Sequence, residues 1–239
     1  MALTIVLCGS GKMSEEVIKQ CSIQNVQCVR FKPGMSGPKN TRGNDAFVAV
    51  HFGRGLDFPA LIRFCEPRYI PIFQASSANI SLPKMPGMPI ITAPNLCLDV
   101  VRQFNALHII LGPSGCVVSE IIESHRPEKV GSATALEFAS IAGVEPSSIV
   151  SVRDWETQKK LGVKEEDRDK TALHIIRIHR EHSDTELRVM CVGRTGYAEG
   201  LLYFARNLAL GSGQTWTNNT RKPVVGIVKI QDLLSLIEQ

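Results

Sequence analysis

The sequence lacks the features that mark membrane-spanning and nucleic-acid-binding proteins. Its 239 residues include only nine Phe, three Tyr and two Trp, and no block of five or more like charges. No apolar run approaches the roughly 18 residues that a transmembrane helix needs. Neither class is therefore indicated. The net charge of +4 is mild and favours phosphorylated or carboxylated ligands.

The cysteines also lack the pattern of a disulfide framework or a zinc site. There are seven, an odd number, and no two of them form a C-x-x-C pair. Most fall in apolar runs, as buried free thiols do. We therefore expect a reducing compartment and no metal. Because no signal peptide precedes the first apolar segment, we expect a cytoplasmic protein. The seven are Cys8, Cys21, Cys28, Cys65, Cys97, Cys116 and Cys191.

The N-terminal residues predict a turn that binds a dinucleotide. The apolar run 3–7 is typical of a buried strand, and 15–21 has helical spacing. Strand, glycine turn and helix are the context that the dinucleotide fingerprint requires. Gly9 would permit the tight turn, Gly11 would let a pyrophosphate approach the backbone, and Ser14 stands where a small residue allows close packing.

The end of the second predicted strand, 25–31, favours NADPH over NADH. An Asp or Glu there would bind the ribose 2′-hydroxyl of NADH, and none is present. Arg30 and Lys32 stand there instead, with Lys39 and Arg42 in the following loop. Positive charge suits a 2′-phosphate. The alternative is that these residues are ordinary solvated cations.

Strands alternate with helices through the first hundred residues, which indicates a parallel α/β sheet. In such sheets ligands lie at the carboxyl ends of the strands. The loops 9–14, 52–54, 74–77 and 93–96 should therefore line one crevice. After residue 96 the pattern changes to an inserted α+β part. Its expected elements are a helix over 98–111, a strand over 116–123, a helix over 132–143, a charged stretch with a short helix over 151–170, and antiparallel strands over 172–179 and 185–191.

A second chemical signal lies in the segment 123–136. His125, Arg126 and Lys129 precede a short run of small and hydroxyl residues, after which an apolar helical pattern begins. Free N–H groups at a helix start attract anions, and a histidine moves protons near neutral pH. These residues predict a cradle for a small dianion. The alternative is that His125 and Lys129 are solvated residues at a strand end.

Together these motifs resemble the dihydrodipicolinate reductase family, over nearly the whole chain. The family's glycine turn G-x-x-G-[RK]-M-G resembles residues 9–14, which are one residue shorter. Its substrate motif E-x-H-H-x-x-K, followed by P-S-G-T-A, matches Glu123, His125, Lys129, Thr134 and Ala135. The segments 93–96 and 193–200 resemble its hinge and its C-terminal motif. His174 falls where the family has a histidine on a strand, and we expect it to be structural.

The resemblance implies a Rossmann-like nucleotide domain, 1–96 plus 196–239, with an inserted substrate and oligomerisation domain, 97–195, that builds a homotetramer. It implies NAD(P)H-dependent reduction of hydroxy-tetrahydrodipicolinate in the diaminopimelate route of lysine biosynthesis. His125 and Lys129 would be catalytic. Substrate would be held by Arg126, Ser132, Ala133, Thr134 and Ser76. The cofactor would be held by Gly9, Ser10, Gly11, Lys12, Met13, Arg30, Lys32, Phe52, Gly53, Gln74, Ala93, Asn95 and Leu96.

The sequence departs from the family pattern at several points. Arg126 replaces the second histidine, and residues 131–134 shorten the P-S-G-T element. The G-T-T-G loop of the family is replaced by residues 74–77, and Leu96 replaces the aromatic residue of the hinge. Two alternatives therefore stay open. Beside the reductase that the resemblance implies, these are a reductase of another small anionic substrate and a non-catalytic protein that binds NADPH.

Overall fold

The computed structural model describes residues 2–35, 46–76, 80–112, 116–211 and 226–238. The chain forms two compact units. Unit 1 comprises Met1–Leu96 and Tyr197–Gln239, and unit 2 comprises Cys97–Gly196. The binding roles expected for these two parts of the chain stay predictions.

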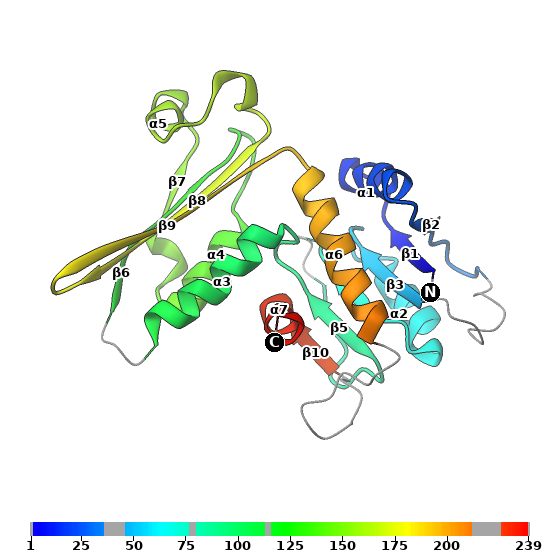
Figure 1. The fold of residues 1–239 in the computed structure, drawn as a ribbon. Coiled ribbons are helices and arrows are strands. Elements are labelled where there is room, and N and C mark those ends of the chain that lie inside the picture. Colours follow the sequence, from blue (N-terminus) through cyan, green and yellow to red (C-terminus); the bar gives the residue numbers. More distant parts are fainter. Residues whose placement is uncertain (1, 36–45, 77–79, 113–115, 212–225, 239) are drawn as a thin grey trace. The chain divides into compact units, whose positions relative to one another are not determined.

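Unit 1 is built on a six-stranded sheet in which every neighbouring pair is parallel, in the order β10-β5-β4-β3-β1-β2 (Figure 1). The sheet and its helices confirm the expected α/β fold. The strands are β1 (Leu3–Cys8), β2 (Gln27–Arg30), β3 (Ala46–His51), β4 (Ile72–Gln74), β5 (Pro89–Thr92) and β10 (Gly226–Lys229). The helices are α1 (Lys12–Ile23), α2 (Phe58–Cys65), α6 (Thr195–Gly211), which begins in unit 2, and α7 (Ile230–Ile237), with the short η1 (Glu66–Arg68) after α2.

Both faces of this sheet are covered, which explains why its central strands are continuously apolar. On one face, Val6, Ala49 and Ile72 pack with Phe58 and Leu61 of α2 in one buried cluster. Alternate strand residues point to the other face. There Phe73 lies 6.3 Å from Phe204 of α6, measured between ring centroids.

The strand order reverses at β1, which has β2 on one side and β3 on the other. A crevice forms outside the carboxyl ends of the strands at such a point, because the two flanking connections leave in opposite directions. The glycine turn Gly9–Gly11 follows β1 directly. The fold therefore places this turn at the position where open parallel sheets bind their ligands.

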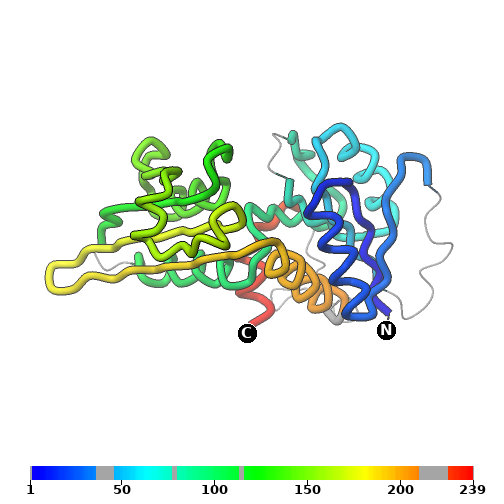
Figure 2. The backbone as a smooth tube through the Cα atoms, turned by 90° about the horizontal axis from the view of Figure 1, so that it is seen from above, coloured from blue at the N-terminus to red at the C-terminus, as the bar shows by residue number. Residues whose placement is uncertain are grey.

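Unit 2 is a four-stranded mixed sheet in the order β7-β6-β8-β9. Strand β6 (Val117–Ser124) pairs parallel with β7 (Ile149–Val152) and antiparallel with β8 (Thr171–Arg180). Strand β9 (Ser183–Val192) completes a long hairpin with β8, which projects past the rest of its unit (Figure 2). The helices are α3 (Leu98–Leu111), α4 (Ala133–Ala142) and α5 (Trp155–Lys160), with the short η2 (Pro146–Ser148) and η3 (Glu165–Asp167).

The two faces of this sheet are covered by different elements. Leu173 and Ile175 point to one face, where they pack with Trp155 of α5. His174, which alternates with them, points to the other face and lies 6.0 Å from the Phe138 ring of α4. Phe138 in turn lies 4.6 Å from Phe104 of α3. Strand β8 is therefore buried on both sides over its first six residues.

One expected stretch of unit 2 was wrong in part. We expected a short helix with loops over 151–170, and helix α5 is present, but Ser151 and Val152 end strand β7. The strand is only four residues long and lies at the sheet edge, with Val150 and Ser151 exposed. Its alternation is too brief to distinguish it from a loop.

None of the helices in the described ranges combines the length and apolar character that a membrane crossing needs. None of the seven cysteines, all of which lie in the described ranges, forms a disulfide, and five of them are buried. No cluster of three or more metal-ligating side chains occurs among the residues that the structure describes.

Replacing Phe138 with alanine should destabilise unit 2. Phe138 is fully buried between Phe104 and His174. Truncation of a buried phenylalanine costs about 3–5 kcal/mol, from lost burial and the cavity left behind. We expect a fall of that size in the free energy of unfolding, measured by urea denaturation. Leu136→Ala, at a 48% exposed position of the same helix, is the control and should cost under about 1 kcal/mol. Equal losses in the two variants would contradict the packing described.

Candidate functional site

The glycine turn of unit 1 contains one position whose backbone conformation requires glycine and one position beside open space. Gly9 has a φ of +135°, and a Cβ there would lie 3.1 Å from Ser14 Oγ and 3.2 Å from the Phe52 carbonyl carbon. Gly11 has an ordinary φ of −83°, and no atom lies within 4 Å of the place a Cβ would take. Gly9 is therefore needed by the fold, whereas Gly11 leaves free space above the turn.

Helix α1 starts at this free space without a side-chain cap. Its N-cap residue is Gly11, which has no side chain to accept a bond from the first-turn N–H groups. Uncapped N–H groups at a helix start bind anions. Arg30, at the end of β2, donates from Nη1 to the Gly9 carbonyl at 3.0 Å and is otherwise exposed. A guanidinium group thus lies beside the turn.

The other residues predicted to hold the cofactor lie at the same edge of the sheet. Hydrogen bonds continue between the strands here: Phe52 N donates to Cys8 O at 2.8 Å, and Ala93 N donates to Gln74 O at 2.9 Å. Gly53 accepts a bond of 2.5 Å from Ser76 Oγ. The structure therefore brings the ends of β1, β3, β4 and β5 together. Their side chains differ in access. Ser10, Lys12 and Lys32 are exposed, Met13 is half-buried, and Ala93, Asn95 and Leu96 are buried; Lys39, Arg42 and Ser77 lie outside the described residues.

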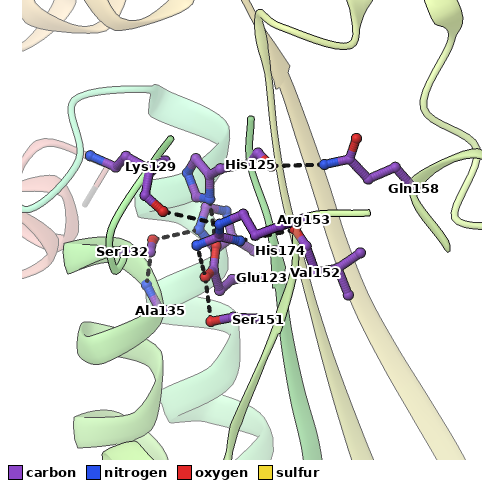
Figure 3. Close-up of polar contacts among 10 residues, drawn as sticks. All are labelled: Glu123, His125, Lys129, Ser132, Ala135, Ser151, Val152, Arg153, Gln158 and His174. Atoms are coloured by element: carbon purple, nitrogen blue, oxygen red, sulfur yellow. Dashed lines mark hydrogen bonds and ion pairs between the residues drawn. The ribbon is translucent and has the colours of Figure 1, made fainter. Parts of the chain in front are cut away.

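In unit 2, a buried carboxylate organises the segment that sequence analysis singled out (Figure 3). Glu123, near the end of β6, is 1% exposed. Its Oε2 lies 2.5 Å from Nδ1 of His125. Its Oε1 accepts a bond of 2.5 Å from Nη2 of Arg153 and one of 2.6 Å from Ser151 Oγ. Both carboxylate oxygens are thus satisfied.

These contacts decide the charge of Glu123. Burial raises the pKa of its carboxyl, but the hydrogen bonds from His125, Arg153 and Ser151 outweigh burial and lower the pKa to about 2. Glu123 is therefore ionised at neutral pH and can only accept. The hydrogen on the His125 ring consequently lies on Nδ1, which leaves Nε2 as the nitrogen that faces other partners.

A second histidine is packed against this pair. The ring of His174 lies 5.3 Å from that of His125 in an edge-to-face arrangement. Burial lowers the pKa of His174 to about 3, His125 adds to the lowering and Glu123 opposes it. His174 is therefore neutral. Its Nε2 lies 3.0 Å from Ser132 Oγ, and its Nδ1 has no partner among the described residues.

Ser132 begins helix α4. Its hydroxyl oxygen accepts a bond of 3.2 Å from the Ala135 N–H, which makes it the N-cap of the helix. Ser132 and Thr134 are buried, whereas Ala133 is exposed. The hydroxyl predicted to hold substrate therefore has two protein partners, and the exposed residue at this helix start is Ala133.

The loop between His125 and α4 carries the remaining cations. Lys129 is half-buried, and Figure 3 shows its amine pointing away from the hydrogen-bonded cluster. Arg126 is exposed, 4.0 Å from a Glu128 oxygen. His125, Lys129 and Ser132 thus lie on one short segment that leads into α4. Ser76, predicted to bind the same substrate, belongs to unit 1.

Sequence reasoning missed part of this site. It noted Glu123 only as a motif match, and it gave no role to Ser151, Arg153 or Gln158, which donates to the His125 carbonyl at 2.7 Å. Glu123 carried a usable signal, because a carboxylate two residues from a histidine on a buried strand needs partners. The three others come from a segment about 30 residues away, and nothing in their local pattern indicates the contact.

No known family profile matches the sequence, and no curated protein matches it. Solved structures do match. Dihydrodipicolinate reductase from Paenisporosarcina sp. TG-14, solved with dipicolinate bound, aligns over 97% of this chain and 99% of its own, with a TM-score of 0.62 and 14% identity. DAP dehydrogenase of C. glutamicum, in complex with DAP, aligns over 98% and 95%, with a TM-score of 0.50 and 10% identity. At such identities the likeness shows the fold that this chain shares with them.

The lowered pKa values of the buried His174 and Glu123 predict how acid destabilises unit 2. The pKa of His174 is about 3 when folded against an ordinary 6.5, so the unfolded chain binds the extra proton and stability falls as the pH drops below 6.5. The slope from one such group is at most about 1.4 kcal/mol per pH unit. The pKa of Glu123 is about 2 against 4.5, so its contribution is lost only below 4.5.

His174→Gln should therefore flatten the pH dependence of unfolding between pH 6.5 and 4.5, whereas Glu123→Gln should leave that range sloped. Urea denaturation at a series of pH values measures both. A wild-type protein whose stability is constant from pH 7 to 4.5 would exclude a buried neutral His174.

Proposed function

We propose that this protein is an NAD(P)H-dependent reductase that converts hydroxy-tetrahydrodipicolinate to tetrahydrodipicolinate, in the diaminopimelate route of lysine biosynthesis. The observation that carries the proposal is the His125 imidazole held at 2.5 Å on the ionised Glu123, on the loop that leads to the start of α4. The fold shared with a reductase of this kind supports it. We further propose a cytoplasmic homotetramer, as the family resemblance implies.

The glycine turn of unit 1 fits a dinucleotide. The space at Gly11 and the uncapped start of α1 suit a pyrophosphate, and Arg30 suits a 2′-phosphate beside the turn. Arg30, Lys32 and the ends of β3, β4 and β5 would hold the rest of the cofactor. When bound, NADPH supplies a hydride from its nicotinamide ring.

In unit 2, the substrate loses water to give a conjugated imine, which accepts the hydride and then a proton. In its imidazolium form, with the Nδ1–H bonded to Glu123, His125 would give that proton from Nε2. Lys129 would stabilise the negative charge that develops. One carboxylate would bind at the start of α4, beside the exposed Ala133, with Arg126 as a second cation.

One observation favours a different anionic substrate for the same chemistry. Arg126 stands where the family pattern has a second histidine, and its guanidinium group is exposed. An arginine binds a carboxylate or phosphate through two parallel hydrogen bonds, which a histidine cannot do. A substrate with a different anionic group would bind Arg126 through such a pair of hydrogen bonds.

NADPH should bind more tightly than NADH, because Arg30 lies beside the turn and no acidic residue ends β2. Calorimetry with both nucleotides measures this, and equal or tighter NADH binding would contradict it.

Gly11→Ala should reduce NADPH affinity at least about tenfold, since its Cβ would fill space that a pyrophosphate needs. Its thermal stability should not fall, because the φ of Gly11 suits alanine. Gly9→Ala, at φ +135°, should lower stability and serves as the contrast.

A coupled assay tests the reaction. Pyruvate, aspartate semialdehyde and the preceding synthase generate the substrate, and the fall in NADPH absorbance is followed with and without this protein. Lys129→Ala should lower kcat about a hundredfold or more and leave NADPH affinity unchanged, because Lys129 belongs to unit 2. Lys164→Ala, an exposed lysine of the same unit, is the control. If NADPH binds but is not consumed, this reaction is excluded and the alternatives remain.

A further inference from the structure

We propose that Arg153 is a positioning residue, which fixes the Glu123 carboxylate and the backbone at Lys129 relative to each other and so orients His125. The consequence for turnover rests on the proposed function. The positioning itself concerns only unit 2 and can be tested without a substrate.

Three contacts of one guanidinium group carry the proposal (Figure 3). Arg153 Nη2 donates to Glu123 Oε1 at 2.5 Å, and Nε donates to the Lys129 carbonyl at 3.0 Å. Nη1 donates to the Val152 carbonyl at 2.9 Å, which ties the side chain to the last residue of β7. The arginine therefore bridges the strand before His125 and the loop after it.

Only an arginine can make this bridge. Its donors form a rigid planar fork, so a bond to the carboxylate fixes the direction of the bond to the carbonyl. A lysine would supply the same charge from a single point on a flexible stem. The charge itself is also needed, because Glu123 is 1% exposed and ionised, and an unpaired buried carboxylate is strongly unfavourable.

The bridge acts on both groups that the proposed reaction uses. Glu123 can orient the His125 ring only while its other oxygen is held, and that oxygen is shared by Arg153 and Ser151. The Lys129 carbonyl sets where the loop passes before it enters α4. Without Arg153, the imidazole and the amine would keep their chemistry but lose their fixed relative positions.

The test compares Arg153→Lys and Arg153→Gln with Arg177→Gln. Arg177, the control, bonds two carboxylates, at 2.6 Å from Glu120 and 3.1 Å from Glu186, but its side chain is 46% exposed. Two measurements need no substrate. Amide hydrogen exchange of the peptide 126–132 reports the loop, and the downfield imidazole N–H proton signal of His125, assigned by its loss in His125→Asn, reports the bond to Glu123.

We expect faster exchange of 126–132 in both Arg153 variants and loss of the downfield signal in Arg153→Gln, with neither change in Arg177→Gln. Arg153→Lys keeps the charge beside Glu123, so it remains informative if the glutamine variant fails to fold. In the coupled assay it should lower kcat about ten- to a hundredfold with little change in NADPH affinity, as happens when a partner that orients a functional histidine is removed.

The outcomes separate the two proposals. Unchanged exchange in Arg153→Lys together with an unchanged His125 signal in a folded Arg153→Gln would overturn the positioning role, whatever the activity. If both signals change but the wild-type protein has no reductase activity, the positioning role stands and the proposed function fails. If exchange changes but kcat of an active enzyme does not, Arg153 is structural only and the proposal is wrong.

Discussion

The buried carboxylate of Glu123 is the constraint on which the candidate site of unit 2 depends. Removing an ionised carboxylate from water costs several kcal/mol, so the fold must surround it with donors. The parallel register of β6 and β7 meets this need, because it places Ser151 opposite Glu123 and Arg153 two residues further on. Strand β7 is short and lies at the edge, and only Val152 of its four residues is buried. Its pairing with β6 is best understood through the donors that it brings to Glu123.

The elements of this fold could be predicted to the extent that their signals were local. Helix α3 has the expected bounds, 98–111, because its apolar periodicity runs uninterrupted over four turns. The hairpin of β8 and β9 was likewise expected. Strand β7 and the role of Arg153 were not, since their evidence lies in a contact across 30 residues of sequence. Motif reasoning located His125 and Lys129 but could not supply the groups that hold them in place, and the roles assigned to them remain predictions.

Helices α1 and α4 begin with different N-cap residues, and this difference limits which anion the start of each helix can bind. Helix α1 begins at Gly11, which offers no cap and leaves open space above its N–H groups. Helix α4 begins at Ser132, whose hydroxyl already satisfies the Ala135 N–H and contacts the buried His174. An extended diphosphate needs several free donors and room for its oxygens, so it suits α1. The start of α4 has fewer donors to offer and suits a single carboxylate.

The charge of Arg126 also affects how anion binding to this loop would depend on pH. His174 is buried and neutral, so it supplies no positive charge beside His125. In the family pattern the residue after His125 is a second histidine, which loses its charge as the pH rises through neutrality. Arginine stays charged throughout that range. If the loop of unit 2 holds an anion, its attraction here depends on the fixed charges of Arg126 and the Lys129 ammonium. Anion binding to this chain should then persist at mildly alkaline pH, where a histidine pair would release it.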